Sequence, residues 1–323
     1  MVPGDVRPDQ RTSALVRAAV LGGTAPSIHN SQPWRWRIGP DTLDLLLERS
    51  RLLTTADPDA RLAVVSCGAA LHHARLELAA SGWRTGVDRH PADDGDQLAR
   101  ISLGGRAEPD RYAGRMVRAT LRRSTDRRTR PSAPLDHDKL RTVAAAVRRE
   151  EARLTLLRPR QIHLLAAAVR LAAAETADPA WQAEVETWLG GVRRAYTGIP
   201  AAALPGGPGP ALLGAGTTSV RDLRDHAAVL GVLSTTTDTR PAWLRAGEAL
   251  SAGWLTATRI EVSVLPLSGV IEVAASRSMV RDLVGDGYPH LVLRFAAGEP
   301  ACTPPRSPRL PAAAIIEHVA GRT

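Results

Sequence analysis

The sequence predicts an α+β fold made of two related units that pack together as an intramolecular pseudo-dimer. Segments with helical spacing alternate with short strand-like segments along the whole chain. The 323 residues, 44% of them hydrophobic, can bury a sizeable core and suggest about two domains or one large intertwined unit. A short pattern also recurs, Gly-Ala-Ala-Leu at 68–71 and Gly-Glu-Ala-Leu at 247–250. The identities are few, but they suggest related units with a site at their interface.

The first unit, residues 1–110, begins with a helix at 12–22. Thr12 or Ser13 is its expected N-cap, and Gly22 and Gly23 end it. The polar loop 24–34 comes next. The remaining expected elements are a strand at 34–38 that alternates Trp with Arg, its hairpin partner at 42–48, a long helix at 60–81 and a strand at 97–103.

The second unit, residues 111–323, follows a charged linker at 104–111. Its expected helices lie at 112–123, 136–149 and 160–175, with a strand at 153–157. The helix carrying 247–250 is expected to be followed by Gly253-Trp254, an apolar strand at 262–267, a helical segment ending at Asp282 and a strand at 290–294. The stretch 198–216 is rich in Gly and Pro, which favours either a flexible linker or a lid.

The formal charge of +9 raises the possibility of a nucleic-acid partner. However, all but one of the 42 basic residues are Arg, the exception being Lys139, and they are spread over the whole length. Tyr and Phe, the usual stacking partners of bases, number only 3 and 1. This composition favours a GC-rich coding bias, and we expect no nucleic-acid function.

The cysteines, Cys67 and Cys302, are far apart in the sequence, so neither a disulfide framework nor a thiolate metal site is indicated. We expect a soluble cytoplasmic protein, because a signal-peptide core and a membrane-length apolar run are both missing. Adjacent His72 and His73 cannot share one helix face, which disfavours a metal site. Dinucleotide-binding glycine motifs, a Walker loop and a Gly-x-Ser-x-Gly elbow are also missing.

The loop 24–34 concentrates hydrogen-bonding side chains between two apolar stretches. Pro26 and Pro33 restrict its backbone, and Ser27 and Asn30 can point into a cleft. The sequence leaves open whether this loop binds a ligand or is a structural turn.

An arginine-rich segment at 122–128 places four guanidinium groups and two hydroxyls within seven residues. Such density favours a bound anion, and a phosphate monoester suits Arg with a hydroxyl donor. Arg306 and Arg309, in the proline-rich tail 303–311, could reach the same phosphate. A solvated basic turn and an exposed tail are the alternative interpretations.

The small residues of Pro266-Leu267-Ser268-Gly269 follow an apolar run and would let backbone N–H groups approach a ligand ring. A plain strand-to-helix turn is the alternative.

Three of these segments resemble, in their order, the nitroreductase-like flavoprotein superfamily. Residues 26–34 are similar to its Pro-Ser-x-x-Asn-x-Gln-Pro-Trp loop, and 122–124 to its Arg-x-Ser element. The third is Pro266–Gly269, and the basic tail 306–311 also has a counterpart. Ordinary members carry the Arg-x-Ser element first, whereas here the Asn loop comes first. This reversed order resembles the Acg family, which looks like two fused nitroreductase units binding one FMN between them.

The resemblance implies an FMN site in which no side chain need act as nucleophile or base. The implied contacts of the flavin ring and phosphate are Ser27, Ile28, Asn30, Gln32, Arg122, Arg123, Ser124, Leu267, Ser268, Gly269, Arg306 and Arg309. Asp126 stands where many members have a basic side chain, with Arg127 one place later.

The function implied by the resemblance is an oxidoreductase that passes hydride from NAD(P)H through FMN to an electron-poor acceptor such as a nitro compound or quinone. If the 198–216 stretch forms a tight lid, the alternative is an FMN storage protein with little or no reductase activity.

Overall fold

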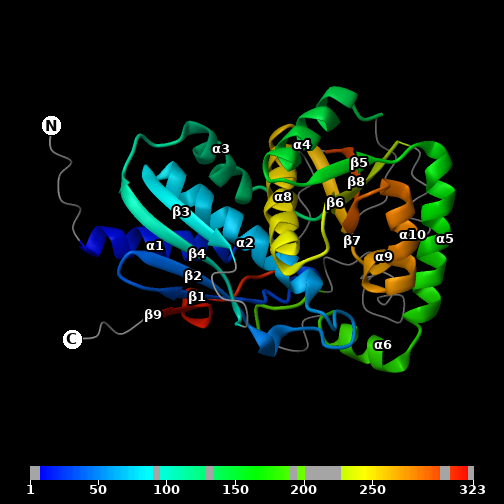
Figure 1. The fold of residues 1–323 in the computed structure, drawn as a ribbon, viewed down its shortest axis with the longest axis horizontal. Coiled ribbons are helices and arrows are strands. Elements are labelled where there is room, and N and C mark those ends of the chain that lie inside the picture. Colours follow the sequence, from blue (N-terminus) through cyan, green and yellow to red (C-terminus); the bar gives the residue numbers. More distant parts are fainter. Residues whose placement is uncertain are drawn as a thin grey trace.

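A computed structural model describes residues 8–89, 95–127, 134–189, 195–200, 227–298 and 306–318 of the chain. Within these ranges the fold has two separate sheets, one on each side of a central pair of long helices (Figure 1). The predicted α+β class is confirmed.

The first sheet has strand order β3-β4-β2-β1-β9. Its strands are β1 (Trp34–Ile38), β2 (Thr42–Leu47), β3 (Trp83–Arg89), β4 (Gln97–Arg106) and β9 (Ile316–His318). The helical elements of this region are α1 (Pro8–Gly22), η1 (Ile28–Asn30), η2 (Arg49–Arg51), α2 (Arg61–Ala80) and η5 (Ala312–Ala314). β9 comes from the C-terminal tail and pairs in parallel with β1, so the end of the chain returns to the first sheet.

The second sheet has strand order β5-β6-β8-β7. Its strands are β5 (Arg153–Leu156), β6 (Val229–Thr235), β7 (Val262–Leu267) and β8 (Tyr288–Ala297). The remaining helices are α3 (Arg111–Thr120), α4 (His137–Arg149), α5 (Pro159–Glu175), α6 (Pro179–Glu186), α8 (Arg240–Arg259), α9 (Gly269–Glu272) and α10 (Ala274–Val284).

The two sheets share one connectivity. In the first, β1 pairs with β2, the chain crosses through α2, and β3 and β4 follow, with β4 between β2 and β3. In the second, β5 pairs with β6, the chain crosses through α8, and β7 and β8 follow, with β8 between β6 and β7. All of these pairings are antiparallel, so the same five-element unit occurs twice in the chain.

The helices α2 and α8 pack closely against each other through glycine. A Cβ atom on Gly68 would lie 1.9 Å from the carbonyl oxygen of Leu244, and one on Gly247 would lie 1.9 Å from that of Val65. Both distances are far below any allowed contact, so only glycine lets the two backbones approach this closely.

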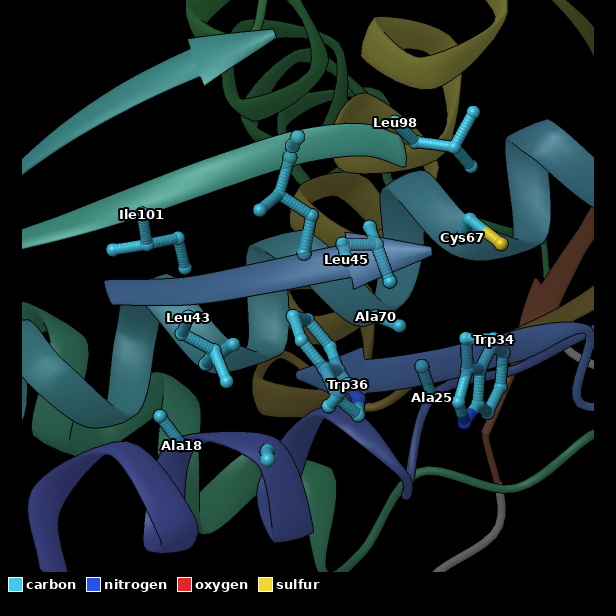
Figure 2. Close-up of a cluster of buried hydrophobic side chains, with 14 of the residues drawn as sticks. Ala18, Ala25, Trp34, Trp36, Leu43, Leu45, Cys67, Ala70, Leu98 and Ile101 are labelled. Atoms are coloured by element: carbon cyan, nitrogen blue, oxygen red, sulfur yellow. The ribbon is translucent and has the colours of Figure 1, made fainter. Parts of the chain in front are cut away.

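The hydrophobic core of the first sheet is built on β1. Its burial alternates as the sequence predicts, with Trp34, Trp36 and Ile38 buried and the arginines between them partly exposed. Figure 2 shows Trp34 and Trp36 close to Ala25 and to Cys67 and Ala70 of α2. This packing anchors the strand that directly follows the polar loop.

Some expectations about single elements are wrong. The first helix begins at Pro8, ahead of the expected cap at Thr12 or Ser13. Gly253 and Trp254 lie inside α8, because Gly253 packs against Val147 rather than ending the helix. The strands β3 and β6 and the helix α6 were not predicted. Most of the 198–216 stretch, expected to be a linker or lid, lies outside the described residues.

None of the helices in the described ranges is both long and apolar enough to cross a membrane.

Candidate functional site

The polar loop has an unusual backbone. His29, Asn30 and Gln32 all have positive φ angles, of 43°, 56° and 52°. Such angles are costly for residues other than glycine and persist only when the surroundings impose them. Two hydroxyls help to do so, because Ser27 accepts a hydrogen bond from the Gln32 N–H and Ser66 of α2 accepts one from the Ile28 N–H, each at 3.0 Å. The loop is therefore a rigid, strained structure.

Asn30 connects the loop to two distant segments. Its amide donates to the carbonyl oxygens of Gly198 at 2.9 Å and Pro308 at 3.1 Å, and its side-chain oxygen accepts from Arg309 at 2.8 Å. Asn30 thus holds the described segment 195–200 and the C-terminal tail against the loop.

Gln32 makes a matching pair of contacts and is fully buried. Its amide donates to the Tyr196 carbonyl oxygen at 2.7 Å, and its side-chain oxygen accepts from the Leu310 N–H at 2.9 Å. The predicted side chains Asn30 and Gln32 are therefore engaged in closing protein segments over the loop, and Ser27 in fixing its backbone.

Two arginines converge on the start of the same loop. Arg123, just after α3, and Arg309, in the tail, both donate to the carbonyl oxygen of Thr24, at 3.3 and 3.4 Å. Arg123 also stacks over the ring of Trp254 at 4.8 Å. Arg306 lies near them and donates to the Leu121 carbonyl oxygen. The structure thus brings the predicted arginine segment, the tail and the polar loop together.

This arginine cluster has the electrostatics of an anion site. Burial, followed by the charges of Arg309 and Arg306, lowers the pKa of Arg123 to about 9, and burial lowers that of Arg309 to about 10. The Nε atoms of both are buried without a hydrogen-bond partner, and neither forms a salt bridge with a carboxylate among the described residues. Buried charges need a counter-charge. A phosphate dianion would supply it, and the guanidinium donors fit its oxygens.

Arg122 and Arg123 differ in their placement. The sequence pattern pairs Arg122 with Ser124, but the Arg122 side chain is exposed, whereas Arg123 is 7% exposed and faces Arg309. Ser124 lies partly buried beside it. Only the fold reveals that Arg123 is the inward-facing arginine. Helix α3 ends at Thr120, so helical periodicity does not predict which of the following side chains points inward.

The third predicted segment follows β7. Leu267 ends the strand, Ser268 stands before α9, and Gly269 begins that helix; Leu267 and Gly269 are buried. Glu272, at the end of α9, places its Oε1 3.8 Å from His29 Nε2 of the polar loop. This contact connects the Leu267–Gly269 segment to the loop.

Sequence reasoning missed His29, Glu272 and Thr24. His29 stands at a variable position of the loop pattern, and Glu272 lies three residues beyond the Leu267–Gly269 segment, so neither carries a motif signal. Thr24 takes part through its backbone, which has no signal at all. Arg127 was noticed, and its charge reaches the loop, because it contributes to the lowered pKa of His29.

The described part of the chain contains no group of three or more His, Cys, Asp and Glu side chains that could hold a metal ion. His72 instead bonds Ser251 at 2.9 Å, and His73 bonds Thr24 at 3.1 Å.

No protein-family model matches the chain. Among solved structures, an FMN- and NADPH-dependent nitroreductase, NfnB, from "sphigopyxis sp. strain HMH" has a TM-score of 0.46 and 16% identity, covering 62% of this chain and 97% of that one. A nitroreductase with bound FMN from Desulfitobacterium hafniense has a TM-score of 0.40 and 15% identity, covering 64% of this chain and 98% of that one.

Curated relatives from Mycobacterium tuberculosis are much more similar in sequence. A protein named "Putative NAD(P)H nitroreductase Rv3131" is 33% identical over 326 residues, covering 96% of this chain and 92% of its own length. Another, named "Putative NAD(P)H nitroreductase acg", is 33% identical over 318 residues, covering 93% of this chain and 94% of its own length. At this identity and coverage, the chain belongs to the nitroreductase family, together with acg.

Proposed function

We propose that the protein is an FMN-dependent oxidoreductase that takes hydride from NAD(P)H and passes it to a small electron-poor acceptor. The observation that carries this proposal is a pair of arginines, the buried Arg123 and the half-buried Arg309, which meet at the polar loop and have no carboxylate partner among the described residues. The relatives named as NAD(P)H nitroreductases agree with this chemistry.

The residues have distinct roles in this proposal. Arg123 and Arg309 hold the FMN phosphate, with Arg306, Arg122 and Ser124 at its edge. The polar loop, through Ser27, Ile28, Asn30 and Gln32, would contact the flavin ring from the first half of the chain. The backbone of Leu267, Ser268 and Gly269 would contact it from the second half. The flavin supplies the hydride chemistry, and the protein supplies position and electrostatics.

We further propose that the chain is a fusion of two nitroreductase-like halves, 1–110 and 111–323, with a single flavin site. The shared connectivity of the two sheets and the reciprocal contacts of Gly68 and Gly247 support the fusion. The differences between the two halves support a single site. The β7–β8 connection contains α9 and α10, whereas the β3–β4 connection spans only residues 90–96. Likewise, 11 residues (23–33) separate α1 from β1, but only 150–152 separate α4 from β5.

A second candidate, FMN storage without turnover, is favoured by the way the loop is covered. Asn30 and Gln32 hold Gly198, Tyr196 and the tail across it, which would hinder access of NAD(P)H to a bound flavin.

Anaerobic titration of the purified yellow protein tests the proposal against this alternative. The oxidoreductase proposal predicts that NADH or NADPH bleaches the flavin absorbance near its oxidised maximum, and that adding a quinone restores it. Persistent oxidised absorbance with both nicotinamides, followed by bleaching with dithionite, would contradict it and favour storage. A colourless protein that fails to bind added FMN would exclude both.

A further inference from the structure

Three buried polar atoms that form no hydrogen bond of ordinary geometry lie where the polar loop meets α9. They are Nε2 of His29 and both carboxyl oxygens of Glu272. Their side chains are 2% and 1% exposed, and Nε2 lies 3.8 Å from Oε1. That separation is too long for a direct hydrogen bond. Because buried polar atoms are almost always paired, a gap of this kind requires an explanation.

An ion pair between His29 and Glu272 does not account for their missing hydrogen bonds. Burial, with the charge of Arg127 adding to it, lowers the pKa of His29 to about 4. Burial raises the pKa of Glu272 to about 8; the Ser268 hydroxyl opposes this and the charge of Asp57 adds to it. Near neutral pH the imidazole is therefore uncharged and the carboxyl group keeps its proton. Both groups can then donate a hydrogen bond.

The neighbouring groups do not fill the gap. Asp57, whose charge acts on Glu272, accepts hydrogen bonds from the Leu62 and Ala63 N–H groups at the start of α2, at 3.1 and 2.9 Å. Arg277 of α10 donates to the Ile271 carbonyl oxygen of α9 at 2.9 Å. Each is committed elsewhere. The Ser268 hydroxyl acts on the Glu272 carboxyl group as a hydrogen-bond donor, so it supplies an acceptor to neither of the two donors. The carboxyl O–H of Glu272 and the Nε2–H of His29 therefore remain for another partner.

The position of the pair is specific. His29 is held with φ 43° and ψ 25° inside the loop, a strained conformation that the fold maintains. Glu272 is three residues beyond Gly269 on α9. The pair therefore joins the two segments that, in the proposed function, contact the flavin ring.

We propose that His29 and Glu272 form a two-donor site for one uncharged oxygen atom of the electron acceptor, a carbonyl or nitro oxygen. An oxygen at ordinary hydrogen-bond distance from both Nε2 and Oε1 fits a separation of 3.8 Å. The positive charge of Arg127 favours an atom with partial negative charge. This inference rests on the proposed function and names residues that position its acceptor.

Binding of a quinone to the oxidised protein tests the inference without turnover. FMN-loaded wild type and variants are dialysed to equilibrium against 2-methyl-1,4-naphthoquinone without nicotinamide. Glu272→Gln keeps a donor, Glu272→Leu removes it, and His29→Asn tolerates the left-handed backbone but is too short to reach the site. Glu175→Leu, at an exposed position at the end of α5, is the matched control.

The inference predicts that Glu272→Leu and His29→Asn weaken quinone binding about tenfold or more, with flavin content unchanged. Glu272→Gln and the control should stay within about twofold of wild type. Unchanged binding by Glu272→Leu, or by His29→Asn if Glu272→Leu does not fold, would overturn it. The inference would also be overturned if the wild-type protein binds FMN and is bleached by NADPH but binds no quinone. That result would leave the proposed function intact. Wild type without flavin would instead defeat the proposed function.

Discussion

Gly68 and Gly247 lie against each other where α2 crosses α8, and neither position has room for a side chain. Each faces the carbonyl oxygen of the residue three positions before the other glycine. One turn further along, His72 bonds Ser251, its counterpart at the same separation of 179 residues. The two helices therefore contact each other through equivalent positions, as subunits do across a two-fold axis.

Replacing Gly68 with Ala should strongly destabilise the protein. The added methyl group would lie 1.9 Å from the Leu244 carbonyl oxygen, so the two helices must separate, at a cost of about 3 kcal/mol or more. Urea unfolding followed by circular dichroism measures the loss. Gly114→Ala is the control, because a Cβ atom added to this helical glycine of α3 would meet only Arg118 Nη1, at 3.9 Å. This change should add about 0.5–1 kcal/mol of stability. Equal effects of the two substitutions would show that the crossing is not tightly packed.

Arg123→Met should weaken FMN binding and yet stabilise the flavin-free protein. The substitution removes a buried cation next to Arg309, which relieves repulsion, but it also removes donors to the phosphate. We expect FMN affinity to fall about tenfold or more and the melting temperature without flavin to rise. Arg122→Met, at an exposed position on the edge of the proposed phosphate site, should weaken FMN binding much less than Arg123→Met and change the melting temperature little. If Arg122→Met releases FMN and Arg123→Met does not, the phosphate is held by the residue that the sequence motif indicates.

Glu248 should be the most sensitive charged residue at the junction of the sheets. It is 1% exposed in α8 and pairs with Arg75 of α2 at 2.6 Å and Arg89 of β3 at 2.7 Å. Glu248→Leu leaves Arg89 without this carboxylate and should cost about 3 kcal/mol or more in unfolding free energy. The exposed pair of Arg49 and Asp96 provides the comparison, and Arg49→Ala should cost less than about 1 kcal/mol. A similar small cost for both would show that the buried network contributes little.

Acid should destabilise the protein well above the pH at which carboxylates usually protonate. Burial lowers the pKa of four histidines, His29 to about 4, His72 and His290 to about 3, and His73 well below its usual value. In the unfolded chain these histidines take up protons below about pH 6.5, whereas in the native protein they stay neutral to a lower pH. The free energy of unfolding that their neutral state contributes above pH 6.5 is therefore lost as the pH falls. The raised pKa values of Asp57 and Glu272 act in the opposite direction.

Between about pH 6 and 4.5 these opposing effects leave a net uptake of roughly two protons when the protein unfolds. The free energy of unfolding should therefore fall by about 3 kcal/mol for each pH unit of acidification. Urea unfolding at pH 7.0, 6.0 and 5.0 measures the slope. Equal transition midpoints at the three pH values would contradict the assignment of neutral buried histidines.

Much of the fold was predictable from local patterns. The alternation of Trp and Arg in β1 predicted that strand, because one of its faces lies in the core. The apolar residues of α2 predicted that helix, which is buried along most of its length. The elements that were missed depend on tertiary contacts. β3 has a largely polar sequence in which only Trp83 is buried, and it becomes a strand by pairing with β4. The helix α8 continues through Gly253, where that glycine packs against Val147.

The site was predictable in its segments but not in its detailed contacts. Sequence motifs predicted that the polar loop, the arginine segment and Leu267–Gly269 belong to the site. In the fold, Arg123 of the arginine segment contacts the loop, and so does Glu272, three residues after Gly269. Which arginine turns inward depends on how the chain leaves α3, and the facing of His29 and Glu272 depends on α9 packing on the loop. Neither leaves a periodic signal in the sequence.

The flavin content of the purified protein tests the central claim most directly. Wild-type chain, loaded with excess FMN and freed of unbound flavin by gel filtration, is denatured, and the released FMN is quantified against protein concentration. A fused pair of halves with one complete site predicts about one FMN per chain, and markedly less in a variant carrying Arg123→Met and Arg309→Met. Two FMN per chain, no FMN, or unchanged FMN in that variant would contradict the account.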